Sequence, residues 1–168
     1  SEGSAVERFL AGSRLISLPP TGNCDWTQPI DGVGHALART SDNHLMIVGQ
    51  QFQGHSYLVK VDDSGQLLWS ETYGVDCTNL VLAVEATDDG GAVVAGHTFS
   101  CETPAGLLIF RVDADGNLLW SKVVGQAFDT GISIHGTSDG GYLVRAICGS
   151  AEFGCNGVRI IKLSPDSE

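Results

Sequence analysis

Short apolar runs, separated by clusters of Gly, Asp, Asn and Ser, recur along the whole chain. Continuous runs such as LMIV at residues 45–48 and AVVA at residues 92–95 are typical of strands covered on both faces. Asp-Gly and Gly-Gly pairs between the runs supply the positive φ angles that two-residue hairpins need. No segment has the pattern of a long helix. The pattern therefore predicts an all-β chain of short antiparallel strands.

The chain also repeats itself. Residues 59–74 read VKVDDSGQLLWSETYG and residues 110–125 read FRVDADGNLLWSKVVG, so that Trp69 and Trp120 lie 51 residues apart. A second phrase appears as TSDNH, TDDGG and TSDGG at residues 40–44, 87–91 and 137–141. Periods of about 40 to 50 residues with short strands and Gly/Asp turns are typical of β-propellers, whose blades are four-stranded antiparallel sheets. We expect the two tryptophans to fill the space between the outer parts of neighbouring blades.

The repeat divides the chain into an N-terminal arm, residues 1–12, and a propeller-like region, residues 13–168. A half unit spans residues 13–30, because SLPPTGNCDW aligns without a gap with RVDADGNLLW and matches Trp26 to Trp120. Unit one spans residues 34–74, unit two residues 79–125 and a partial unit three residues 131–163. Besides a strand at residues 14–18 and the Trp26 strand, the expected strands are residues 35–40, 44–50, 56–61, 66–72, 81–87, 92–98, 106–112, 117–123, 131–137, 142–147 and 158–163.

The stretch TYGVDCTNLVLAVEATDDGGAVVAGHTFS at residues 72–100 resembles the bacterial SBBP-type and related secreted β-propeller repeats. In those repeats a Tyr-Gly stretch, an aliphatic strand, an Asp-Gly turn and a closing Gly-x-Thr recur. The resemblance covers residues 34–163, although Asn43-His44 replace Gly-Gly in unit one. It implies a propeller fold in an extracellular or cell-surface protein. It implies no activity, because the shared motifs are turn and core positions.

Composition limits the classes of partner. The chain is 42% hydrophobic and 17% charged, which is globular composition. Its net charge of −11 repels nucleic-acid phosphates and anionic lipid headgroups, so we expect no nucleic-acid partner. No apolar run approaches the roughly 20 residues that a membrane-spanning helix needs, so we expect no membrane insertion. Because the sequence starts at Ser1 without a signal-like segment, it is either a processed chain or a piece of a longer one.

Five cysteines favour an oxidising compartment, and none has the spacing of a redox, haem or zinc motif. Cys77 and Cys101 lie in connections that are expected at the same end of unit two, so they can form a disulfide. Cys148 and Cys155 flank a six-residue hairpin loop and can also be bridged. The alternative for each pair is two separate thiols. Cys24 is left over, as a free buried thiol or as a link between chains.

The sequence carries no signature of an enzyme. Asp113-Ala114-Asp115-Gly116-Asn117 resembles the start of a calcium loop, but the glycine and the glutamate that would complete it are missing, which favours a hairpin turn. The histidines show no paired ligand spacing, and neither a Gly-x-Ser-x-Gly motif nor a phosphate-binding loop occurs. We therefore predict no catalytic residue, no cofactor-binding residue, no metal ligand and no cofactor.

Counted from Trp26, the expected strands number twelve, or about three blades with an incomplete last blade. Propellers close with about four to eight blades, and an open stack exposes edges that invite pairing. One interpretation is that the Trp26 strand of one chain completes the third blade of a neighbour, which gives a homo-oligomeric ring or a filament. The other is that the chain is part of a longer propeller.

The functional hypothesis is a secreted or surface structural module that self-associates through its incomplete blades. The alternatives are a carbohydrate- or protein-binding propeller module, an excised part of a larger propeller protein, or a hydrolase or lyase with its site in the central channel.

The cysteine analysis predicts two disulfides and one remaining thiol. Alkylation of the denatured, unreduced chain should label one cysteine, and peptide mapping should recover the pairs Cys77–Cys101 and Cys148–Cys155. Labelling of three or more cysteines, or pairs of other composition, would contradict the assignment.

Overall fold

A computed structural model of the chain describes residues 13–17, 26–30, 32–51, 54–74, 78–100, 105–124, 129–150 and 155–164. Within these ranges the chain is all-β, as predicted, with thirteen strands and no helix. The strands are β1 (Ser13–Ser17), β2 (Trp26–Ile30), β3 (Val33–Arg39), β4 (Leu45–Gln50), β5 (Ser56–Val61), β6 (Leu67–Tyr73), β7 (Thr78–Ala86), β8 (Ala92–Ser100), β9 (Gly106–Val112), β10 (Leu118–Val124), β11 (Asp129–Gly136), β12 (Tyr142–Ser150) and β13 (Cys155–Leu163).

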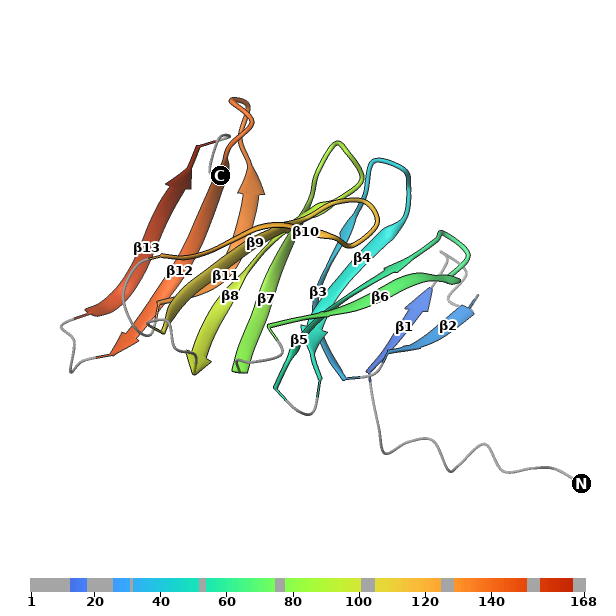
Figure 1. Ribbon diagram of the computed structural model, residues 1–168, viewed down its shortest axis with the longest axis horizontal. Coiled ribbons are helices and arrows are strands. Elements are labelled where there is room, and N and C mark those ends of the chain that lie inside the picture. Colours follow the sequence, from blue (N-terminus) through green and yellow to red (C-terminus); the bar gives the residue numbers. More distant parts are fainter. Residues whose placement is uncertain are drawn as a thin grey trace, which may run out of the picture.

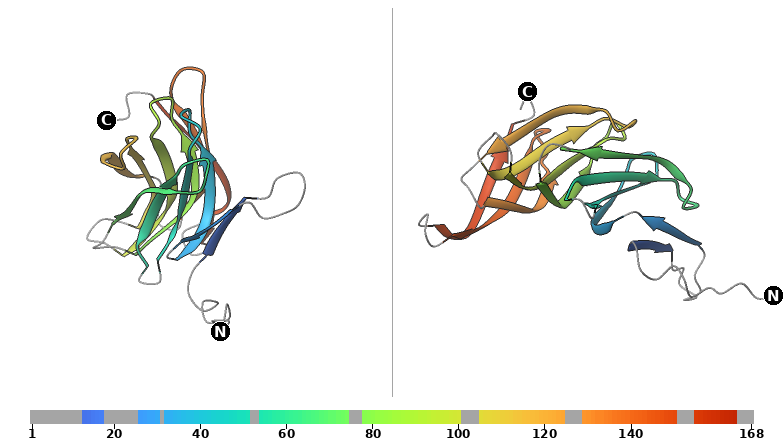
Figure 2. Two further views of the ribbon diagram at one scale, coloured as in Figure 1. Left: turned by 90° about the vertical axis from the view of Figure 1, so that its right-hand side faces the viewer. Right: turned by 60° about the horizontal axis from the view of Figure 1, so that its bottom comes forward.

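Neighbouring strands pair antiparallel and in chain order. An N-terminal hairpin, β1-β2, precedes a first sheet β3-β4-β5-β6, a second sheet β7-β8-β9-β10 and a third sheet β11-β12-β13. The sheets stand side by side and form an arc, with the hairpin at one end and the third sheet at the other (Figures 1 and 2). The twelve strands expected from Trp26 onward correspond to β2 to β13, and the expected strand at residues 14–18 forms β1.

The N-terminal hairpin has the register that the sequence alignment predicted. Ser17 pairs with Trp26, as Lys60 pairs with Trp69 in the first sheet and Arg111 with Trp120 in the second. The hairpin therefore corresponds to the third and fourth strands of a sheet. Since β2 pairs with β1 of its own chain, pairing of the Trp26 strand with another chain stays a prediction.

The repeated Thr-x-Asp turns are three-residue loops, so the expectation of two-residue hairpins was wrong. The N–H of Asn43 donates to the carbonyl of Thr40, and the equivalent bonds close the turns at Gly90 and Gly140. A loop of this kind needs one left-handed residue, and the φ angles are 67° at Asn43, 82° at Gly90 and 80° at Gly140. Asn43 keeps the conformation of the glycines because asparagine tolerates the left-handed region.

Each sheet carries apolar side chains on both faces. The core therefore lies between the sheets, where these faces pack on each other. One cluster joins the first and second sheets, and Trp69 and Tyr73 pack against it. Another joins the second and third sheets, and Trp120 packs against it. Both tryptophans therefore cover the junctions between sheets, as expected. Gly131 shows how tight this packing is, because a Cβ atom there would lie 2.6 Å from Leu107 Cδ1.

Candidate functional site

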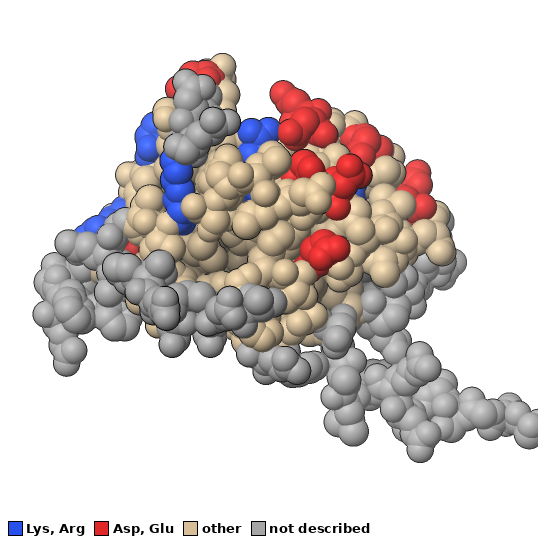
Figure 3. Space-filling model, in the orientation of Figure 1, with Lys and Arg blue, Asp and Glu red and all other residues tan. Residues whose placement is uncertain are grey.

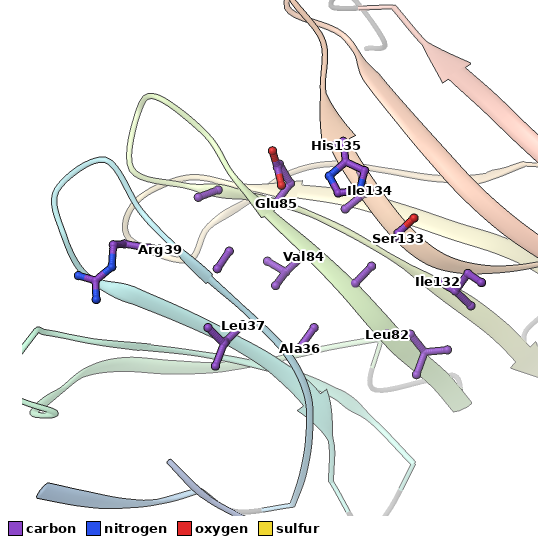
Figure 4. Close-up of a pocket in the computed structure, with 13 residues that line it drawn as sticks. Ala36, Leu37, Arg39, Leu82, Val84, Glu85, Ile132, Ser133, Ile134 and His135 are labelled. Carbon is purple, nitrogen blue, oxygen red and sulfur yellow. The ribbon is translucent and has the colours of Figure 1, made fainter. Parts of the chain in front are cut away.

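A groove of about 470 Å³ follows the concave side of the arc across β3, β7 and β11 (Figure 4). Its floor consists of small and aliphatic side chains, such as Ala36, Ala83 and Ile134. Each of the three strands places a polar residue on the lining: Arg39, Glu85 and His135. The groove is therefore formed by the first strand of each of the three sheets.

The polar groups of this groove do not converge on a common point. The Arg39 guanidinium donates to the Asn43 side chain at 2.7 Å, and Glu85 accepts from the Gly136 N–H at 3.3 Å. In Figure 4, Arg39 and His135 lie at opposite ends of the lining. Among the described residues, no group of three or more His, Cys, Asp or Glu side chains is placed to hold a metal ion. The described lining therefore does not bring Arg39 and His135 together.

A basic residue and the aspartate of a turn form an ion pair at the same position in every sheet. The Nζ or Nη atoms lie 2.7–3.0 Å from the carboxylate oxygens, in the pairs Lys60–Asp42, Arg111–Asp89 and Lys162–Asp139. The ammonium group of Lys162 and the hydroxyl of Thr137 lower the pKa of Asp139. Partial burial alone would raise the pKa of Asp42, but hydrogen bonds from Thr40 and Lys60 outweigh it and lower the pKa.

The first of these pairs also joins two sheets. Lys60 is buried, and its Nζ donates to the carbonyls of Gly90 at 3.0 Å and Ala114 at 3.4 Å, which lie in turns between strands of the second sheet. Trp69 donates to the same Ala114 carbonyl at 2.9 Å, and the Tyr73 hydroxyl donates to the Gly116 carbonyl at 2.6 Å. The first sheet is thus fixed on the second by directional bonds as well as by apolar packing.

The next junction differs, because Arg111 bonds Asp89 of its own sheet. A cleft of about 530 Å³ lies between the second and third sheets, with Asp88, Arg111 and Tyr142 in its lining. A lectin with equivalent pockets would repeat this combination at each junction. At the first junction Lys60 takes the position of Arg111 and reaches into the second sheet, so the two junctions are not equivalent.

The outward face of the third sheet is the most distinctive surface of the described chain. We call it the terminal face and define it by four apolar side chains, Leu143, Ile147, Val158 and Ile160, with Arg145 and Lys162 among them. Ile160 is 59% exposed, whereas its counterparts Leu58 and Ile109 in the other sheets are 0% exposed. Leu143 is 37% exposed, and its counterparts Met46 and Val93 are also fully buried. The terminal face therefore has the character of a buried sheet face but lies open.

Arg145 distinguishes the terminal face from the two buried ones, because it replaces Val48 and Ala95 of the other sheets. It lines a shallow groove of about 440 Å³ together with His135 and Ile160. In Figure 3, Lys and Arg gather on the side of β12 and β13, whereas Asp and Glu gather over the turns of the first and second sheets. The terminal face therefore combines exposed apolar and basic side chains.

Most of the cysteines and the Trp26 side chain fall outside the described side chains. Cys24, Cys77 and Cys101 lie outside the described residues, and Cys155 is described only by its backbone at the start of β13. Cys148 is buried in β12. Both proposed pairings therefore stay predictions.

The calcium-like sequence at residues 113–117 forms the hairpin turn that its incomplete pattern favoured. Oδ1 of Asp113 accepts the N–H groups of Asp115 at 2.9 Å and Asn117 at 2.8 Å. Hydrogen bonds from the Asn117 side chain and backbone lower the pKa of Asp113. The Asp113 carboxylate thus stabilises the turn by accepting its backbone N–H groups.

The comparisons with known proteins define the fold alone. No family model and no curated protein matches the chain. A crystal structure of a protein of unknown function from Bacteroides caccae is similar, with a TM-score of 0.52 and 17% identity over 92% of this chain. This chain spans 59% of the length of that protein. In the described part of the chain there is also no helix of the length and apolarity that crossing a membrane requires.

The bonds of Lys60 lead to a stability prediction. Lys60→Met should lower the free energy of unfolding by about 2–3 kcal/mol. The substitution removes the ammonium group that donates to two carbonyls and to the Asp42 carboxylate, and methionine supplies no donor in its place. Urea denaturation measures the change. Lys162→Met is the matched control and should have little effect, since Lys162 is exposed. Equal losses in the two variants would contradict the role assigned to Lys60.

Proposed function

We propose that the chain is a structural module of β-propeller-like architecture that self-associates through its terminal face. The arrangement of the sheets supports the architecture. Sheets with a common register pack face to face along an arc, and the first strands of the three sheets, β3, β7 and β11, lie next to one another along its concave side. Each sheet would be one blade, and the N-terminal hairpin would be the outer half of another.

The observation that carries the proposal is the exposure of the terminal face. Three of its four apolar side chains, Leu143, Val158 and Ile160, occupy positions that are buried in both other sheets. Ile147 occupies the position of the buried His97 and the half-buried Gln50. Covering partly exposed aliphatic side chains of this size stabilises a complex by about 1 kcal/mol each. A contiguous apolar surface of this kind is typical of an interaction site.

A second copy of the chain is the occupant that the charges favour. The described third sheet contains three basic and two acidic side chains, whereas the described first sheet contains two basic and four acidic ones. Asp62 and Asp63 lie in the turn that precedes the exposed Leu67 and Leu68 of β6, so this region offers acidic and apolar groups to a basic and apolar face. Contact between these different surfaces is head to tail, and it gives a ring if the rotation closes and a filament if it does not.

Docking of faces leaves the N-terminal hairpin intact. Exchange of the Trp26 strand, by contrast, would break the five residue pairs between β1 and β2. Face docking therefore avoids the loss of these pairs. An extracellular or cell-surface location fits this role, and it is supported by the cysteine content and by the resemblance to secreted repeats.

A substitution in the terminal face tests the proposal. Ile160→Asp should weaken self-association by at least about tenfold, because it places a carboxylate in the apolar contact. Leu37→Asp is the matched control, since Leu37 is 57% exposed in the concave groove and should leave association unchanged. Sedimentation equilibrium measures both, and thermal melts show whether each variant is folded. A monomeric parent chain, or equal effects of the two substitutions, would overturn the proposal.

A further inference from the structure

The strand β13 is an edge strand of the described third sheet. It pairs with β12 through nine residue pairs, and the strand order β11-β12-β13 leaves its other edge open among the described residues. Its counterparts β5 and β9 lie between two strands in the first and second sheets. An open edge presents backbone N–H and C=O groups to any chain that can add a strand. Among the described residues, the third sheet therefore has one strand fewer than the first and second sheets.

The strand that fills this position elsewhere in the chain has a constant sequence. It is β6, LLWSETY, in the first sheet and β10, LLWSKVV, in the second. In both, the tryptophan lies opposite the basic residue of the ion pair, as Lys60 opposite Trp69 and Arg111 opposite Trp120. Lys162 is the basic residue at the same position of β13.

The tryptophan is the side chain that anchors this fourth strand. Trp69 and Trp120 are partly buried against the apolar clusters between sheets, and Trp69 also donates a hydrogen bond to Ala114. With this strand in place every residue of β5 is buried, whereas Val158, Ile160 and Lys162 of β13 are exposed. A tryptophan opposite Lys162 would cover the stem of that lysine and the adjoining apolar surface.

We propose that the open edge of β13 binds an extended polypeptide segment of the type Leu-Leu-Trp-Ser, antiparallel and with its tryptophan opposite Lys162. Backbone hydrogen bonds along β13 supply affinity, and the tryptophan fixes the register. The partner is a polypeptide that carries such a strand, and an acidic residue after the motif suits the basic third sheet. The inference rests on the proposed function in one respect, because both treat the third sheet as incomplete.

The probe is a fluorescein-labelled peptide with the sequence GQLLWSETY, which corresponds to residues 65–73. Fluorescence anisotropy with the full chain should show saturable binding, and replacement of the tryptophan by alanine should weaken it at least about tenfold. Methylation of alternate backbone nitrogens of the peptide should abolish binding for one alternating set and spare it for the other, because only every second N–H faces the added edge.

The outcomes separate this inference from the proposed function. The same titration with Ile147→Asp, a substitution in the terminal face that lies on β12 and leaves the edge strand β13 unchanged, should show peptide binding even when self-association is lost. Absence of binding, binding that tolerates methylation at every position, or equal binding of a scrambled peptide would overturn the edge proposal. Because self-association is measured without the peptide, its result stands on its own.

Discussion

The packing of one sheet face on the next is the interaction on which the rest of this structure depends. Both faces of β4 and β8 carry apolar side chains, and no sheet of this kind is stable in water unless both faces are covered. Within the chain, each junction supplies this cover, and Lys60 and Trp69 add hydrogen bonds that fix the first sheet on the second. The third sheet has the same apolar faces but is covered on only one side among the described residues. The terminal face is therefore a direct consequence of the repeat.

Much of this arrangement could be predicted from the sequence because it depends on local chemistry. The repeated Trp and the Asp-Gly turns marked the strand boundaries, and the alignment of residues 17–26 gave the register of the N-terminal hairpin. The turn type was missed, since one left-handed residue or two cannot be told from a Gly-Gly pair alone. Asn43 carried the relevant signal, because a single asparagine replaces the first glycine.

The residues of the terminal face could have been identified from the repeat, but their exposure to solvent could not. Alignment places Leu143 at a buried position of the other sheets, and only the structure shows that nothing described covers it. The sequence also could not predict that Lys60 bonds the neighbouring sheet whereas Arg111 bonds its own, because both residues can form an ion pair with a turn aspartate. Their reach depends on the distance to the next sheet, which is a property of the packing. The structure likewise shows that Arg39 and His135 lie apart in the groove on the concave side. The spacing of these residues along the sequence does not predict this separation.

The most direct test of the central claim uses the unmodified chain. Hydrogen–deuterium exchange, measured at a low and at a high protein concentration, reports which backbone segments become protected on association. The account predicts that protection rises with concentration in β12 and β13 and in the acidic turn region before β6, while β3 and the concave groove are unchanged. Protection that is independent of concentration, or that appears only along the concave side, would contradict it.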